Sequence, residues 1–109
     1  VIAKRLADSL SNLTKLYPVQ PIDKSIPAYW GFLILSSKRD DLLVHLKKHG
    51  VNASCLHHRN DLYSGFGKSF SNLPGTEIAI SEMLALPCGW WLTDLQIEKL
   101  LTIINEFKN

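Results

Sequence analysis

The spacing of apolar residues divides the chain into short helices and strands. Near the start, apolar side chains recur every three or four residues, as they do on one face of a helix: Ile2, Leu6, Leu10, Leu13 and Tyr17. This pattern predicts a helix over residues 1–17, which Pro18 would end. No N-cap residue precedes Val1, so we expect the helix to continue a segment that lies upstream.

A second apolar run, IPAYWGFLILS at residues 26–36, is rich in branched and aromatic side chains and alternates little, which predicts a central strand. A helix is expected at residues 40–50, with leucines 42, 43 and 46 on its buried face. Asp40 and Asp41 near its start and Lys47 and Lys48 near its end match the charges that the helix dipole favours there. Gly50 suits the left-handed conformation that commonly ends a helix. Residues 51–57 then predict a second strand, in which alternation places Cys55 and His57 on one face.

The second half of the sequence predicts a loop at residues 59–73, a short helix at 74–83, a brief edge strand at 84–87 and a last helix that runs to Phe107. The start of the last helix carries the most specific local signal. Thr93 is expected to be the N-cap, Gln96 completes a capping box, and Leu92 with Ile97 would form the hydrophobic staple.

Together these elements predict an α+β fold, in which a small, mostly antiparallel three-stranded sheet packs against four helices. A length of 109 residues suits one domain with a core of its own, covering residues 1–109. Neither an internal repeat nor an interior linker divides the chain.

Charge and composition narrow the possible partners. Twelve Lys and Arg are scattered among ten Asp and Glu, which gives a net charge of +2 and no basic stripe, so nucleic acid is not expected as a partner. No apolar run approaches the ~20 residues that a membrane helix needs. Cys55 and Cys88 are expected to be reduced thiols in the cytoplasm, because a core of this size does not need a disulfide.

The polar run HHRND at residues 57–61 is the main candidate for chemistry. A zinc site would draw on Cys55, His57, His58 and Asp61, with or without Cys88. The sequence lacks the paired ligands of structural zinc sites, and alternation turns the two histidines to opposite faces, so no metal is expected. A nucleophilic cysteine beside His57 is the second possibility, but an unpaired cysteine in an apolar strand is usually an inert core residue.

Two further features point to turns and to the surface. The glycines of SGFGKSF, Gly65 and Gly67, do not have the spacing of a phosphate-binding loop, so they are expected to form turns, with Lys68 solvated. Trp90 and Trp91 are adjacent and cannot both point into one small core. One of the pair is therefore expected on the surface, which indicates either contact with a partner or a tryptophan that packs on its own domain beside solvent.

Three features of the sequence carry a likeness to a known family. They are a helix, glycine and strand unit with its turn at Gly50, the leucine-proline pairs Leu73-Pro74 and Leu86-Pro87, and the WLTD start of the last helix at Trp91 to Asp94. With them, nearly the whole chain resembles the C-terminal small domain of the DegT/DnrJ/StrS nucleotide-sugar aminotransferases. The opening helix resembles the connector that leaves the large domain of such enzymes.

The resemblance implies a homodimeric pyridoxal-phosphate enzyme of the aspartate-aminotransferase fold type. Such enzymes transfer an amino group, usually from glutamate, to a nucleotide-linked keto-sugar in deoxyamino-sugar or cell-surface polysaccharide biosynthesis, although the family also includes dehydratases. The cofactor is held by an N-terminal large domain through a Schiff-base lysine and a phosphate cup. No lysine here has a matching context, so this segment alone is expected to be inactive and to bind no cofactor.

By position, the resemblance implies that five residues lie near the substrate at the dimer interface: His57, Arg59, Asn60, Asp61 and Tyr63. Arg59 would hold a carboxylate or phosphate, and His57 and Asn60 would bind sugar hydroxyls. The alternative, that Arg59 and Asp61 only pair and shape the loop, stays open. Many family members have a tyrosine- and proline-rich sequence in place of HHRND, which suggests a subgroup with its own substrate.

A second hypothesis belongs to a different functional class. In it, this α+β domain acts alone, without a cofactor, as a binding or oligomerisation module. The two hypotheses differ in whether the natural protein contains a large cofactor-binding domain upstream of Val1.

Overall fold

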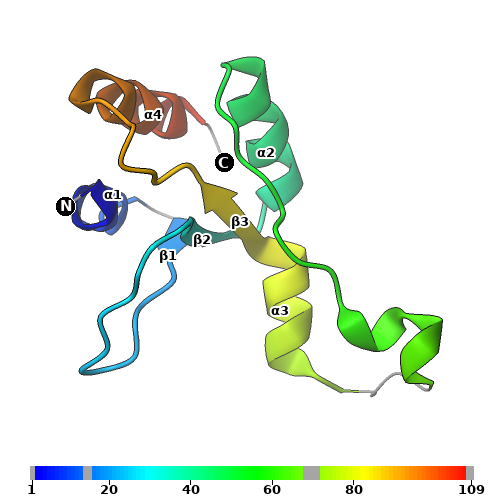
Figure 1. The fold of residues 1–109 in the computed structure, drawn as a ribbon. Coiled ribbons are helices and arrows are strands. Elements are labelled where there is room, and N and C mark those ends of the chain that lie inside the picture. Colours follow the sequence, from blue (N-terminus) through cyan, green and yellow to red (C-terminus); the bar gives the residue numbers. More distant parts are fainter. Residues whose placement is uncertain (1, 14–15, 68–71, 108–109) are drawn as a thin grey trace.

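The computed structural model describes residues 2–13, 16–67 and 72–107. In chain order, the elements within these residues are α1 (Ile2–Leu10), β1 (Leu16–Pro18), β2 (Phe32–Ser36), α2 (Arg39–Lys48), the 3₁₀ turns η1 (Asn60–Leu62) and η2 (Ser64–Phe66), α3 (Pro74–Glu82), β3 (Met83–Leu86) and α4 (Asp94–Glu106) (Figure 1). The strands form one antiparallel sheet in the order β1, β2, β3. The predicted α+β fold, with a three-stranded sheet and four helices, is confirmed.

The hydrophobic core is built around the central strand, β2. Phe32, Ile34 and Ser36 are buried on its inner face, and β2 pairs with β3 so that Ile34 lies opposite Leu84. Helices α1, α2 and α4 supply the other side of the core through apolar residues at helical spacing: Leu6, Leu10, Leu42, Leu46, Ile97, Leu100 and Ile104. Burial of these side chains supplies most of the free energy that holds the helices on the sheet.

Helix α1 is shorter than its apolar pattern predicts. It ends at Leu10 rather than near Tyr17, and a turn closed by a hydrogen bond from the Leu13 N–H to the Leu10 carbonyl follows. Residues 16–18 then pair with β2 as an edge strand, with Leu16 buried and Tyr17 exposed. The prediction was wrong here because residues 16–18 pair with β2, a contact between distant parts of the chain that the local apolar spacing does not encode. Pro18 fits this place, since prolines are tolerated at sheet edges.

Two predicted strands also differ from those observed. Only residues 32–36 of the run 26–36 join the sheet, because Tyr29 adopts a positive φ of 50°, which breaks the extended backbone before Phe32. Residues 51–57 form no named strand and make a single bridge, between Ser54 and Ala85. Their backbone is bonded elsewhere: the Val51 N–H donates to Leu46 at the end of α2, and the Ala53 N–H donates to Val51.

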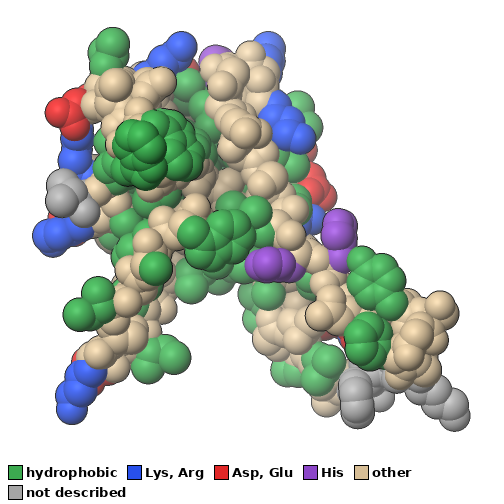
Figure 2. All heavy atoms as spheres, viewed as in Figure 1, with side chains coloured by type: hydrophobic (Ala, Val, Ile, Leu, Met, Phe, Trp, Pro, Cys, Tyr) green, Lys and Arg blue, Asp and Glu red, His purple; other side chains and the backbone are tan. Residues whose placement is uncertain are grey.

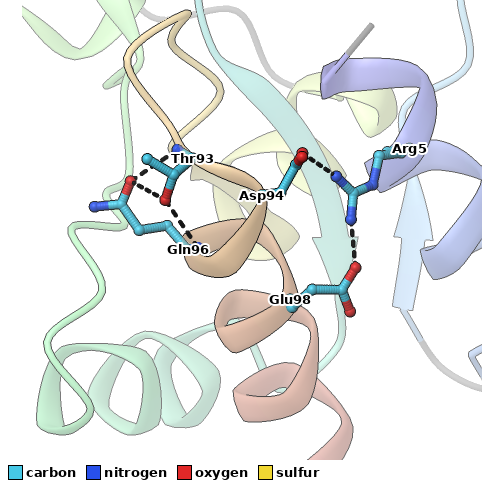
Figure 3. Close-up of polar contacts among 5 residues, drawn as sticks. All are labelled: Arg5, Thr93, Asp94, Gln96 and Glu98. Carbon is cyan, nitrogen blue, oxygen red and sulfur yellow. Dashed lines mark hydrogen bonds and ion pairs between the residues drawn. The ribbon is translucent and has the colours of Figure 1, made fainter.

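The predicted end residues of α2 and the predicted start of α4 are confirmed. Helix α2 has Asp40 and Asp41 in its first turn, and Gly50 follows its end with a φ of 76°. At the start of α4, the Gln96 N–H donates to the Thr93 Oγ1 at 3.3 Å, and the Thr93 N–H donates to the Gln96 Oε1 at 2.9 Å (Figure 3). This is the capping box that the sequence predicts.

Two parts of the chain project from the body (Figure 1). One is the connection between β1 and β2, and the other is the lateral segment, which we define as residues 57–67 and 72–82. The radius of gyration is 15.1 Å, against about 13 Å for a compact domain of this size. None of the described residues of the lateral segment is buried, so this segment has little core of its own.

Candidate functional site

The run HHRND leads from the bridge at Ser54 into η1 and faces helix α3 across an open groove of about 400 Å³. His57, Arg59, Asn60 and Asp61 line one wall of this groove, together with His58. Thr76, Ala79 and Ile80 of α3 line the opposite wall. Four of the five residues predicted to bind substrate therefore come together here. Tyr63, the fifth, is exposed and does not line the groove.

Arg59 is the best-connected side chain of the site. Its Nε–H donates to the Asp61 Oδ1 at 2.9 Å, and its Nη2 donates to the Asp61 Oδ2 at 2.5 Å, which is a two-pronged pair. Its Nη1 donates to the Glu77 Oε1 in the first turn of α3. The side chains of Arg59 and Asp61 are only 11% and 17% exposed, although both lie in a surface loop.

These contacts shift the ionisation of both groups. The hydrogen bonds from Arg59 lower the pKa of Asp61 below the ordinary carboxyl value, because they stabilise its charged form. In turn, the hydrogen bonds to Asp61 raise the pKa of the Arg59 guanidinium above its already high value, and Glu77 adds to this effect. Both groups are therefore charged at neutral pH, and the pair holds its form over the physiological range.

The exposed polar groups of the run are His57, His58 and Asn60. The ring of Trp30 lies edge-on to that of His57, with 6.4 Å between the ring centroids. Neither Trp30 nor Glu77 was among the residues predicted from the sequence to form the site. An acidic residue in the first turn of a predicted helix is a signal that could have drawn attention to Glu77, whereas nothing in the local sequence links Trp30 to His57.

The structure gives no support to metal or thiol chemistry. The residues that it describes contain no group of three or more His, Cys, Asp or Glu that could hold a metal ion. Cys55 and Cys88 are both free, and Cys88 is buried. Burial raises the pKa of the Cys88 thiol, whereas a nucleophilic cysteine needs a lowered pKa.

A second surface feature is aromatic and apolar. Figure 2 shows hydrophobic side chains gathered near the segment that joins β3 to α4. Trp90 is 88% exposed, and Trp91 and Trp30 are also exposed, so both members of the tryptophan pair lie on the surface. Together they line a groove of about 700 Å³ that also includes Ile2 and Cys88. Exposed apolar surface of this kind is typical of regions that contact another protein or a ligand. No helix in the described part of the chain has both the length and the apolar character to cross a membrane.

Comparison with known proteins places the site in a wider context. The sequence model of the "DegT/DnrJ/EryC1/StrS aminotransferase family" matches residues 1–105. A search of curated proteins found no match. Among solved structures, the chain is similar to the aminotransferase TlmJ from Streptoalloteichus hindustanus, with 28% identity and a TM-score of 0.86, over 94% of this chain and 29% of that one.

Two further structures share the fold. They are the sugar aminotransferase CalS13 from Micromonospora echinospora, with 24% identity, a TM-score of 0.86 and coverage of 94% of this chain and 28% of that one, and AtS13 from Actinomadura melliaura, with 22% identity, a TM-score of 0.89 and coverage of 98% and 29%. The chain thus spans less than a third of the length of the structures that it resembles, as a C-terminal domain of such proteins would.

Proposed function

This chain belongs to the DegT/DnrJ/EryC1/StrS aminotransferase family, and from that membership we propose that it is the C-terminal small domain of a pyridoxal-phosphate-dependent sugar aminotransferase. The observation that carries the proposal is the family match over residues 1–105, which the similarity to TlmJ supports. The proposed reaction transfers an amino group, usually from glutamate, to a nucleotide-linked keto-sugar. The free thiols at Cys55 and Cys88 support a reducing compartment, the cytoplasm.

Pyridoxal phosphate supplies the electron sink for such a transfer when it is bound. The described residues of this chain do not fit a site for it. Their lysines are all exposed, and none lines the groove beside α3, whereas a Schiff-base lysine needs an enclosed setting that lowers its pKa. We therefore place the cofactor in a large domain outside this chain, and we expect the 109-residue segment alone to be inactive.

The share of the small domain is to close the site and to contact the substrate. We place the exposed side chains of His57, Asn60 and Tyr63 next to the nucleotide-linked sugar, because imidazole, amide and phenol groups can exchange hydrogen bonds with hydroxyls. Arg59 and Asp61 belong to the same segment, but their mutual ion pair favours a supporting role. The exposed tryptophans suit contact with the large domain or with a second subunit of a homodimer.

The test uses the natural full-length protein that contains this chain. We expect it to bind pyridoxal phosphate, seen by visible absorbance, and to transfer an amino group from glutamate to a keto-sugar nucleotide, seen by formation of 2-oxoglutarate. Replacing the Schiff-base lysine of the large domain should abolish the reaction. A full-length protein without a large domain, which assembles stably with no cofactor, would instead support the binding-module hypothesis.

A further inference from the structure

The segment that contains the proposed substrate contacts is weakly held by the rest of the molecule. Among the residues that the structure describes, its backbone hydrogen bonds are local: the Tyr63 N–H donates to Asn60, the Phe66 N–H to Tyr63, and the Gly67 N–H to Ser64. The described residues 57–67 include no buried side chain. Such a segment opens easily unless side-chain contacts tie it to a more rigid element.

Arg59 provides such a tie. Its guanidinium donates hydrogen bonds to both carboxylate oxygens of Asp61, which fixes the turn into η1. Its Nη1 also donates to Glu77 in α3. Helix α3 is itself joined to α2, because the Arg39 Nη1 donates to the Ile80 carbonyl at 2.8 Å. The contacts therefore run from the body through α3 to the HHRND run, and they hold the two walls of the groove at a set separation.

The charges of this group do not suit direct binding of a phosphate or carboxylate. One guanidinium faces two carboxylates, so the three side chains carry an excess of one negative charge. An incoming anion would meet that excess and would have to displace a carboxylate from a guanidinium that is only 11% exposed.

We propose that Arg59, Asp61 and Glu77 form a positioning group, which holds His57 and Asn60 opposite α3 without contacting the substrate. The proposal rests on the proposed function for what His57 and Asn60 bind. The rigidity that it assigns to the loop does not depend on that function.

The chain offers a matched control in Arg5. Its Nη1 donates to the Asp94 Oδ1 at 2.5 Å and its Nη2 to the Glu98 Oε1, so it too is an arginine between two carboxylates, here joining α1 to α4 (Figure 3). The apolar faces of α1 and α4 are buried in the core, and Arg5 lies outside the groove beside α3.

The first measurement is amide hydrogen exchange in the full-length protein without substrate. In Arg59→Met, the amides of Tyr63, Phe66 and Gly67 should exchange at least about tenfold faster, because the turn loses its tie to α3. In Arg5→Met, the same amides should exchange at the wild-type rate. Unchanged exchange in Arg59→Met would overturn the proposal, whether or not the protein proves to be an aminotransferase.

The second measurement is steady-state kinetics with the sugar nucleotide. Arg59→Met should raise KM by about tenfold with a smaller change in kcat, since displaced binding groups weaken substrate binding. Arg59→Lys should bring KM only part of the way back to the wild-type value, because an ammonium group cannot form the bidentate interaction with Asp61. In the Arg59→Met background, Asp61→Asn should cost little more, because the two residues act as one unit. Additive losses, or a raised KM with unchanged exchange, would mean direct substrate contact and would overturn the proposal.

Discussion

The body and the lateral segment use the same ionic arrangement for different purposes. In the body, Arg5 joins α1 to α4, whose leucines and isoleucines are already packed in the core. In the lateral segment, Arg59 joins the HHRND run to α3, and none of the described residues of this segment is buried. Where buried apolar side chains already hold two helices together, an exposed ion pair adds little to the free energy of unfolding. Where a segment has few buried side chains, an ion pair can determine the position of a loop.

The largest effect should come from the body. Ile34→Ala in β2 removes a fully buried side chain next to Leu84, and should lower the free energy of unfolding by about 2–5 kcal/mol. Ile78→Ala in α3 removes a side chain that is half exposed, and should cost less than about 0.5 kcal/mol. Denaturant unfolding of both variants measures the contrast. Equal losses would show that the lateral segment has a core after all.

The next effect is local to the start of α4. Thr93→Ala removes the hydroxyl that accepts from the Gln96 N–H, and should cost about 1 kcal/mol of unfolding free energy. Thr93→Ser is the control, since it keeps the hydroxyl and should remain close to the wild type. If Thr93→Ala also unfolded at the wild-type denaturant concentration, the capping box would be of no consequence in a helix that the core already holds.

A smaller effect is expected for the ion pair of the body. Arg5→Met keeps much of the side-chain volume but removes both bonds to α4, and should lower the unfolding free energy by less than about 1 kcal/mol. Added salt should reduce the difference between the variant and the wild type, because both carboxylate partners are well exposed. A loss of several kcal/mol would remove the distinction between the two arginines.

The smallest effect on the whole domain concerns acid. Because the pKa of Asp61 is lowered in the folded state by Arg59, its pairing contributes stability above the ordinary carboxyl pKa of about 4, and this is lost as the pH falls through the folded value. Carbon NMR of the Asp61 carboxyl group should give a midpoint below the ordinary value. In Arg59→Met the midpoint should rise toward that value, while an unmoved midpoint would contradict the pairing.

The sequence predicts well those features that depend on residues close together in the chain. The Thr93 capping box and the glycine after α2 depend on residues within one helical turn, so both were predicted in place. Strand β1 was missed because three residues become a strand only when β2 lies beside them. The strand predicted at residues 51–57 was wrong for the converse reason, since only Ser54 finds a partner in β3.

The candidate site divides in the same way. Four of its residues are close together in the sequence, within the HHRND run, and could be predicted from it. The pairing of Arg59 with Asp61 was one of the two alternatives that the sequence left open. Arg59 and Glu77 lie eighteen positions apart in the sequence, and the whole of α2 lies between Trp30 and His57 in the sequence. Such contacts depend on how the helices are placed on the sheet, and no local pattern encodes them. Whether these residues bind substrate stays a prediction.

The single bridge between Ser54 and Ala85 has a consequence for behaviour in solution. Strand β3 lies at the edge of the sheet, where free backbone groups can recruit a strand from another molecule. The Ser54 N–H donates to the Ala85 carbonyl at 3.2 Å, and the Ala85 N–H donates to the Ser54 carbonyl at 2.9 Å. These two bonds occupy the backbone N–H and carbonyl of Ala85 in the short strand β3, so Ser54 hinders the pairing of a strand from another molecule at this edge of the sheet, while β1 forms the other edge.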